Sequence, residues 1–157
     1  MQVLFVCTGN TCRSPMAEAL LKHEIARDVA LSHIKVKSAG VLVREDGVAS
    51  SRAIEALKSK NIDLTEHISR QLTQAALDES DLILTMTKSH ADFIKQSFDT
   101  SKVKVYPLKE FIGETGDVVD PFGGSDKEYE TTALELEDLV KKVARLLKRE
   151  DEKCKEK

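Results

Sequence analysis

Seven residues near the amino terminus combine a nucleophilic side chain with groups that bind anions, and they read Cys7-Thr-Gly-Asn-Thr-Cys-Arg13 (loop 7–13). Gly9 permits a left-handed turn and Asn10 tolerates one, so successive backbone N–H groups are predicted to point inward as an anion-binding nest. Arg13 adds a planar guanidinium that matches two oxyanion oxygens. We therefore predict that the loop binds inorganic phosphate or a phosphoryl group. The predicted binding residues between its two ends are Thr8, Gly9, Asn10, Thr11 and Cys12.

Cys7 lies at the base of this loop, after an apolar run, and is expected to face the centre of the positive field. Positive surroundings favour the thiolate form of a cysteine, which is the nucleophilic form. Ser14, at the far end of the loop, is positioned to donate a hydrogen bond to that thiolate. A nucleophile, an anion-binding loop and a charged clamp within eight residues indicate phosphoryl transfer.

Other interpretations of the two cysteines explain less of the pattern. A buried structural cysteine is common at the end of a strand, but it leaves Arg13 and the glycine unexplained. Cys7 and Cys12 lack a second Cys or His pair, so we expect no zinc or other metal site and no cofactor. No Gly-Lys-Ser/Thr follows, which excludes the nucleotide-binding P-loop. A non-enzymatic oxyanion-binding module with an inert Cys7 stays open as an alternative class.

Strand-like and helical patterns alternate along the chain, which is typical of an α/β fold whose parallel sheet carries helices on both faces. In such a sheet, the loop after the first strand lies where ligands bind. Apolar or alternating runs predict strands at residues 2–6, 34–39, 81–86 and 103–106. Apolar residues at helical spacing predict helices at residues 14–28, 51–60, 73–77 and 89–98, and a final helix from Ser125 or Asp126 to about residue 147.

Local signals also predict how these elements begin and end. Ser14 is a suitable N-cap, and Pro15 fits the first helical position because its missing N–H is not needed there. No repeat or break in composition divides the chain, so residues 1–150 are predicted to form a single domain. Residues 151–157 are predicted to be a solvated, charged tail, and residues 113–124 (loop 113–124) form the longest loop.

The composition excludes several classes of protein. The chain has 157 residues, a net charge of −3 and three cysteines. Its negative charge argues against nucleic-acid binding, and no apolar run is long enough for a membrane span. Without a signal peptide or an even set of cysteines, we expect a cytoplasmic protein, and we expect a monomer. Surface or helix-cap positions are predicted for all four histidines, which are His23, His33, His67 and His90.

Loop 7–13, followed by Ser-Pro, resembles the low-molecular-weight protein tyrosine phosphatases. The resemblance covers essentially the whole chain, through SAG at residues 38–40, DLILTM at residues 81–86 and Asp120-Pro in the longest loop. It implies a flavodoxin-like fold of three layers, with a doubly wound, four-stranded parallel sheet in the order 2-1-3-4. It also implies phosphorylated proteins as substrates.

The segment GDVVDPFGGS offers two acids, Asp117 and Asp120, although Asp-Pro and Gly-Gly are also ordinary turn sequences. Cleaving a phosphate ester or amidate requires a proton for the leaving group. The resemblance places this general acid at Asp120 and leaves Asp117 to shape the loop. It further implies that Cys7 attacks phosphorus, that Arg13 stabilises the phosphoryl oxygens, and that Asp120 then acts as a base toward water.

Two departures from the tyrosine-directed members resemble the protein-arginine-phosphatase branch of the family. Those members usually carry a bulky aliphatic residue at the position of Thr11, and an aromatic residue after Asp-Pro that a second Tyr often follows. This chain has a hydroxyl at Thr11, which can bond a polar guanidinium or hold the hydrolytic water. It also has Phe122 followed by two glycines, and Phe122 suits a lid over a flat substrate. We predict hydrolysis of phosphoarginine in proteins, which that branch links to bacterial stress control. Phosphotyrosine hydrolysis, with a purely local role for Thr11, is the alternative.

The second cysteine of the loop has two possible roles. Cys12 is predicted to pack behind the loop or, when Cys7 is oxidised to a sulfenic acid, to trap it as a reversible disulfide. Arsenate reductases can share this fold and loop, but their chemistry typically needs two further cysteines that relay a disulfide. This chain has only Cys154 outside the loop, which is predicted to be a free surface thiol.

Overall fold

The protein forms one parallel sheet in the order β2-β1-β3-β4, in a computed structural model that describes residues 1–44 and 47–157. This is the predicted fold and strand order. The strands are β1 (Gln2–Cys7), β2 (Lys35–Gly40), β3 (Leu82–Thr85) and β4 (Lys104–Pro107). The helices are α1 (Arg13–Ala26), α2 (Ser51–Lys58), α3 (Gln74–Asp78), α4 (Lys88–Ser97), α5 (Leu108–Phe111) and α6 (Asp126–Lys155), with a 3-10 turn at Val29–Leu31.

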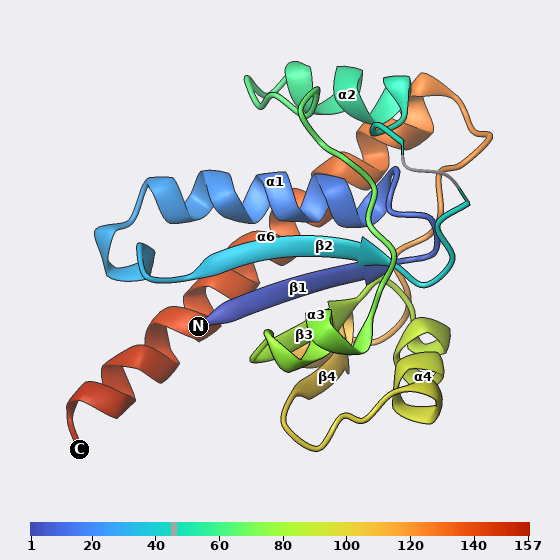
Figure 1. Ribbon diagram of the computed structural model, residues 1–157. Coiled ribbons are helices and arrows are strands. Elements are labelled where there is room, and N and C mark those ends of the chain that lie inside the picture. Colours follow the sequence, from blue (N-terminus) through green and yellow to red (C-terminus); the bar gives the residue numbers. More distant parts are fainter. Residues whose placement is uncertain (45–46) are drawn as a thin grey trace.

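Helices cover both faces of the sheet, which gives the predicted three layers (Figure 1). Because side chains alternate along a strand, Val3 and Phe5 of β1 pack toward α1, α2 and α6, whereas Leu4 and Val6 pack toward α3 and α4. Strand β3 is buried along its whole length, which explains its continuous apolar sequence. The sequence missed α5 and the 3-10 turn because each is too short to show a helical period.

The strand order creates a switch point at the carboxyl ends of β1 and β3. From β1 the chain crosses to β2 on one side, whereas from β3 it continues to β4 on the other. Loops diverge at such a point, and open α/β sheets bind ligands there. Loop 7–13 follows β1 at this place. Loop 113–124 reaches it too, because the backbone N–H of Val118 donates to the carbonyl of Met86 at 2.8 Å.

Helix α1 begins at Arg13 with Cys12 as its N-cap residue, so the predicted capping role of Ser14 is wrong. The Ser14 hydroxyl is occupied elsewhere, 2.8 Å from Cys7 Sγ. Pro15 consequently lies at the third helical position rather than the first. Cys12 makes no side-chain capping bond, which leaves the positive end of the helix facing loop 7–13.

Helix α6 begins after Ser125, one of the two predicted caps, but it runs to Lys155 instead of ending near residue 147. Glu, Lys and Arg are good helix formers, so a charged sequence continues the helix. His33 Nε2 also lies 2.7 Å from Asp151 Oδ2, which ties this end to the loop before β2. The predicted tail is therefore largely the last turns of α6. Among the described residues, no helix is both long and apolar enough to cross a bilayer.

Candidate active site

A cleft of about 550 Å³ opens at the switch point and collects most of the predicted site residues. Loop 7–13 forms its floor, and Asp120 and Phe122 line it from loop 113–124. Asn10 and Ser14 are the two predicted residues that do not line it, and both are fully buried behind the loop. The lining residues are Cys7, Thr8, Gly9, Thr11, Cys12, Arg13, Leu42, Arg44, Gly47, Asp120 and Phe122.

Gly40, the last residue of β2, lets loop 7–13 lie directly against the neighbouring strand. A Cβ atom at this position would be 2.7 Å from the Thr8 carbonyl oxygen and 3.0 Å from the Asn10 nitrogen. Such distances are too short for any side chain, so the glycine of the SAG motif is required by packing. The Leu42 N–H then donates to the Thr8 carbonyl at 2.9 Å, which fixes the start of the loop.

Asn10 adopts the left-handed conformation of the loop, with φ of 57°, whereas Gly9 does not have a positive φ. The left-handed turn that the sequence allowed at either residue is therefore made by Asn10 and not by Gly9. Hydrogen bonds hold Asn10 in this conformation: its Nδ2 donates to Ser14 Oγ at 2.8 Å and to Ser38 Oγ at 2.9 Å. Its Oδ1 accepts the Arg70 N–H at 3.0 Å. The buried amide thus joins the loop to α1, to β2 and to the segment before α3.

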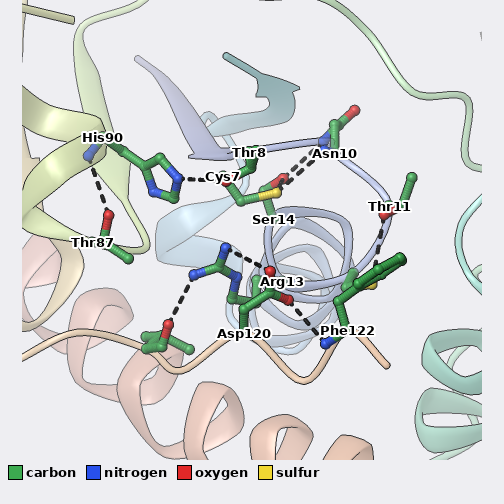
Figure 2. Close-up of polar contacts among 12 residues, drawn as sticks. Cys7, Thr8, Asn10, Thr11, Arg13, Ser14, Thr87, His90, Asp120 and Phe122 are labelled. Carbon is green, nitrogen blue, oxygen red and sulfur yellow. Dashed lines mark hydrogen bonds and ion pairs between the residues drawn. The ribbon is translucent and has the colours of Figure 1, made fainter. Parts of the chain in front are cut away.

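The Cys7 thiol is buried at the base of the loop and has two polar neighbours (Figure 2). Its Sγ lies 2.8 Å from Ser14 Oγ, the contact predicted from the sequence, and accepts the Asn10 N–H at 3.3 Å. The Asn10 N–H is a donor and the Ser14 hydroxyl can act as one, so both neighbours suit a thiolate. These contacts direct Cys7 Sγ toward the inside of loop 7–13, beside the uncapped end of α1.

Arg13 connects the two loops of the site. Its guanidinium is buried and donates from Nη1 to the Val118 carbonyl at 2.9 Å, which fixes its plane. Its Nη2 lies 3.5 Å from Asp120 Oδ2, as Figure 2 shows. The other oxygen of Asp120 accepts the Phe122 N–H at 3.0 Å. A cation, a thiol and a carboxyl group therefore share one cleft, which is the arrangement that phosphoryl transfer to a thiol needs.

Residues 2–153 match the family described as low molecular weight phosphotyrosine protein phosphatase. The chain belongs to this family. Its fold, its strand order and the motif at loop 7–13 all agree with that membership.

The similar proteins include some that are named arginine phosphatases and others that are named tyrosine phosphatases. The chain is 47% identical over 151 residues to a protein-arginine-phosphatase of Bacillus subtilis (96% of this chain, 99% of the relative). It is 40% identical over 144 residues to the low molecular weight protein-tyrosine-phosphatase PtpB of Staphylococcus aureus (91% and 96%). A solved structure of the YwlE arginine phosphatase, a cysteine-to-serine mutant with a phosphorylated active-site serine, matches with a TM-score of 0.88 and 47% identity (94% and 96%).

Two histidines contact loop 7–13 from outside the cleft, and the sequence did not reveal either contact. His23 and His33 are exposed as predicted, but His90 is only 8% exposed, so its predicted surface or cap position is wrong. Its Nε2 lies 2.9 Å from Thr8 Oγ1. His67 Nε2 lies 2.9 Å from the Asn10 carbonyl. No local motif signals these contacts, because each joins loop 7–13 to a segment far along the chain.

Cys12 is buried, as its predicted packing role requires, but it also lines the cleft. Its Sγ lies 3.5 Å from Ser50 Oγ and 3.4 Å from the Tyr129 hydroxyl, both of which the sequence also missed. Burial, followed by the hydrogen bond to Cys12, raises the pKa of Tyr129 to about 12, so the phenol stays neutral. Cys154 is exposed, as predicted, near the end of α6, and Figure 1 shows that this end of the helix lies far from the carboxyl end of β1. That distance weighs against an arsenate-reductase relay.

Proposed function

We propose that this chain is a protein-arginine phosphatase that cleaves the P–N bond of phosphoarginine through a phosphate held covalently on Cys7. Membership of the phosphatase family and the shared cleft of Cys7, Arg13 and Asp120 support the phosphatase chemistry. The 47% identity to a protein-arginine-phosphatase supports arginine as the phosphorylated residue. Phosphotyrosine is the second candidate, because a relative of 40% identity is named a tyrosine phosphatase.

The observation that carries the arginine assignment is the environment of Thr11. Its carbonyl accepts the Ser50 N–H at 2.9 Å, which fixes the backbone of the residue at the cleft wall. Within the described part of the chain, its hydroxyl has one polar contact, Cys12 Sγ at 3.6 Å, and sulfur is a weak partner. The hydroxyl is thus available to a substrate. A guanidinium brings several N–H donors that need acceptors, whereas the ring of phosphotyrosine brings none.

In the first chemical step, the Cys7 thiolate attacks phosphorus and a P–S bond forms as the P–N bond breaks. Arg13 and the backbone N–H groups of loop 7–13 stabilise the phosphoryl oxygens in this step. The proton of the Asp120 carboxyl group moves to the departing guanidino nitrogen, so the arginine side chain leaves as a stable group. The Ser14 hydroxyl, 2.8 Å from the sulfur, helps to hold the thiolate before attack.

In the second step, water attacks the phosphorus of the cysteinyl phosphate. The Asp120 carboxylate takes a proton from the water, and the P–S bond breaks to release inorganic phosphate and the Cys7 thiolate. Asp120 is protonated again at the end, so the enzyme returns to its starting state without an external reactant. The half-exposed position of the Asp120 side chain allows it to face the leaving group and then water.

Phe122 supplies the apolar part of the substrate site in this proposal. Its side chain is 77% exposed at the mouth of the cleft, and its N–H is bonded to the Asp120 carboxylate. A planar ring at this position covers a flat guanidinium while the carboxylate faces the guanidinium N–H groups. Both contacts favour phosphoarginine without excluding a phosphorylated phenol, since the phosphoryl cradle is shared.

The direct test compares kcat/KM for matched phosphoarginine and phosphotyrosine peptides, in the wild type and in Thr11→Ile. We expect the wild type to prefer phosphoarginine, and Thr11→Ile to shift the ratio toward phosphotyrosine by about tenfold or more, the scale of one hydrogen bond to a charged group. Thr11→Ser keeps the hydroxyl and is expected to keep the preference. A wild type that prefers phosphotyrosine peptides would make the second candidate correct.

The nucleophile is tested separately from the substrate. Cys7→Ser is expected to lose turnover of both peptides by roughly 10⁴-fold or more while still binding phosphate. An unchanged rate in this variant would refute the covalent mechanism and revive the oxyanion-binding module. Phosphate binding is measured by titration calorimetry on the same preparation, which also serves as the control for folding.

We also propose that Cys12 protects the nucleophile against oxidation, since both thiols line the same cleft. A sulfenic acid on Cys7 would condense with the Cys12 thiol, forming an S–S bond and releasing water. Peroxide should then inactivate the wild type reversibly, with activity restored by dithiothreitol, whereas Cys12→Ser should be inactivated irreversibly. Equal recovery of both proteins would refute this role.

The cellular setting that fits this chemistry is a reducing cytoplasm, where the three cysteines stay free. There we infer a role in bacterial stress control, on proteins that a kinase has phosphorylated on arginine. Deletion of the gene in the source cell should raise the level of phosphoarginine in cytoplasmic proteins after heat or oxidative stress. An unchanged level would refute this setting and leave the enzymatic assignment intact.

A further inference from the structure

His90 is a buried polar residue next to the cleft that the chemistry above does not use. It lies in the first turn of α4, the helix that follows β3, and its backbone N–H donates to Thr87 Oγ1 at 3.1 Å. Its Nε2 lies 2.9 Å from Thr8 Oγ1, whereas its buried Nδ1 has no hydrogen-bond partner in the described residues. Figure 2 shows the ring pointing from α4 toward loop 7–13. The side chain therefore spans the switch point between β1 and β3.

The charge of this histidine follows from its surroundings. Burial, and after it the nearby charge of Arg13, lowers the pKa of His90 to about 4. The carboxylates of Asp117 and Asp120 act in the opposite direction but do not compensate. His90 is accordingly neutral at neutral pH, with one N–H and one unprotonated ring nitrogen.

The unpartnered Nδ1 then decides which nitrogen carries the hydrogen. If Nδ1 carried it, a buried N–H donor would have no acceptor, which is the costlier of the two defects. If Nε2 carries it, the ring donates a hydrogen bond to Thr8 Oγ1, and only the lone pair of Nδ1 lacks a hydrogen-bond partner among the described residues. The network therefore favours the Nε2–H tautomer, in which His90 donates to Thr8 Oγ1.

We propose that His90 is a positioning residue that converts the Thr8 hydroxyl into a donor for the phosphoryl group. Since Thr8 Oγ1 accepts the hydrogen of His90, its own hydrogen is directed elsewhere, and Thr8 lines the cleft. Loop 7–13 then offers a side-chain O–H in addition to its backbone N–H groups and Arg13. The inference rests on the proposed function only in that the cleft binds phosphate, whichever phosphorylated residue delivers it.

The test measures the Kd of inorganic phosphate by titration calorimetry, and its Ki as a competitive inhibitor of turnover. Thr8→Val removes the hydroxyl and keeps the branched shape, and we expect it to weaken phosphate binding by about tenfold, as for one hydrogen bond to an anion. His90→Leu should weaken binding to a similar extent. Thr8→Ser and His90→Gln, which keep the hydroxyl and an N–H donor respectively, should restore most of the affinity.

The double variant separates a positioning role from a structural one. If His90 acts through Thr8, Thr8→Val with His90→Leu should bind phosphate no more weakly than Thr8→Val alone. Additive losses, or a Thr8→Val protein with wild-type affinity, would overturn the proposal. His33→Leu changes a histidine that contacts Asp151 of α6 instead of loop 7–13, so it is the matched control and should leave phosphate affinity unchanged.

Two further measurements keep the outcome clear. Thermal unfolding of each variant reports folding, and if His90→Leu does not fold, the comparison of His90→Gln with Thr8→Val and Thr8→Ser still decides whether the hydroxyl binds phosphate. Turnover of the wild type on phosphoarginine and phosphotyrosine peptides tests the proposed function by itself. A wild-type protein that binds phosphate but does not turn over either peptide would refute the proposed phosphatase activity and leave the role of His90 intact.

Discussion

The two loops that meet in the cleft are held in very different ways. Loop 7–13 is held by buried side chains, although Thr8 is exposed: Asn10 is fully buried and the Arg13 side chain is only 5% exposed. In loop 113–124, the Asp120 side chain is 49% exposed and Phe122 is 77% exposed. Its main described anchors are the Val118 N–H on Met86 and the Asp117 carboxylate, which accepts the Lys88 N–H at 2.9 Å.

This difference matches what each loop has to do. A phosphoryl group is stabilised best by donors that are already in place before it binds, because no reorganisation is then needed during the reaction. The general acid, Asp120, needs more freedom to move, since it must give a proton to the leaving group and later take one from water. A rigid anion site with an exposed acid beside it therefore separates the two requirements between two segments of the chain.

The largest effect in the exposed loop is expected from Asp120→Asn. The amide keeps an oxygen for the Phe122 N–H but is not a general acid, so kcat should fall by about 10² to 10⁴-fold with little change in phosphate affinity. The measurement compares kcat of the variant and the wild type on two substrates, one with a poor and one with a good leaving group. The loss of kcat should be smaller for the good leaving group, which needs less help from an acid.

Asp117→Asn is the matched control for this prediction, because it alters the other acid of the same loop. We expect a smaller loss, since the amide oxygen still accepts the Lys88 N–H and only the anchor is weakened. If Asp117→Asn lost more activity than Asp120→Asn, and lost it in a way that depended on the leaving group, the acid would be Asp117.

A second prediction compares stability in the two loops. Asn10→Ala removes a buried amide with three side-chain hydrogen bonds and forces alanine into a left-handed conformation, so the free energy of unfolding should fall by about 2–4 kcal/mol. Phe122→Ala, at an exposed position, should change it by less than about 0.5 kcal/mol and raise KM instead. Urea unfolding of both variants checks this, and similar losses in the two loops would contradict the contrast.

The difference between the two loops also explains which parts of the site could be predicted from the sequence. Loop 7–13 carries its chemistry in adjacent residues, so Cys7, Arg13 and the Ser14 contact could be inferred from spacing. The strand order came from the resemblance to a family and was confirmed. Asp120 was chosen over Asp117 by the same resemblance, and turn chemistry alone would not have distinguished them.

The support of loop 7–13 was not predictable, because it comes from side chains far away in the sequence. His90 is 82 positions from Thr8, and Ser38 is 28 positions from Asn10. These contacts also explain why Asn10 and not Gly9 makes the left-handed turn. Both residues tolerate that conformation, and the bonds of the Asn10 side chain to Ser38 and Arg70 favour it at Asn10. Periodicity finds elements, but it does not find the polar contacts between them.

The smallest expected effect is a pH dependence of stability that comes from this hidden support. The pKa of His90 is about 4 in the folded protein, below its ordinary value of 6.5. Between these values the unfolded chain binds a proton that the folded chain does not, so the free energy of unfolding should decrease as the pH falls through this window. Above it, His90 is neutral in both states and its contribution is constant.

His90→Gln removes the titrating ring and keeps an N–H donor, so its stability should change less between neutral pH and about pH 5 than that of the wild type. Carboxylates with lowered pKa values, such as Asp28 and Asp63, titrate at lower pH and contribute little in this interval. Urea unfolding of both proteins at the two pH values gives the difference directly. Equal slopes would mean that His90 becomes protonated in the folded state, with a buried charge beside Arg13. The surroundings of His90 would then be more open to water than its contacts indicate.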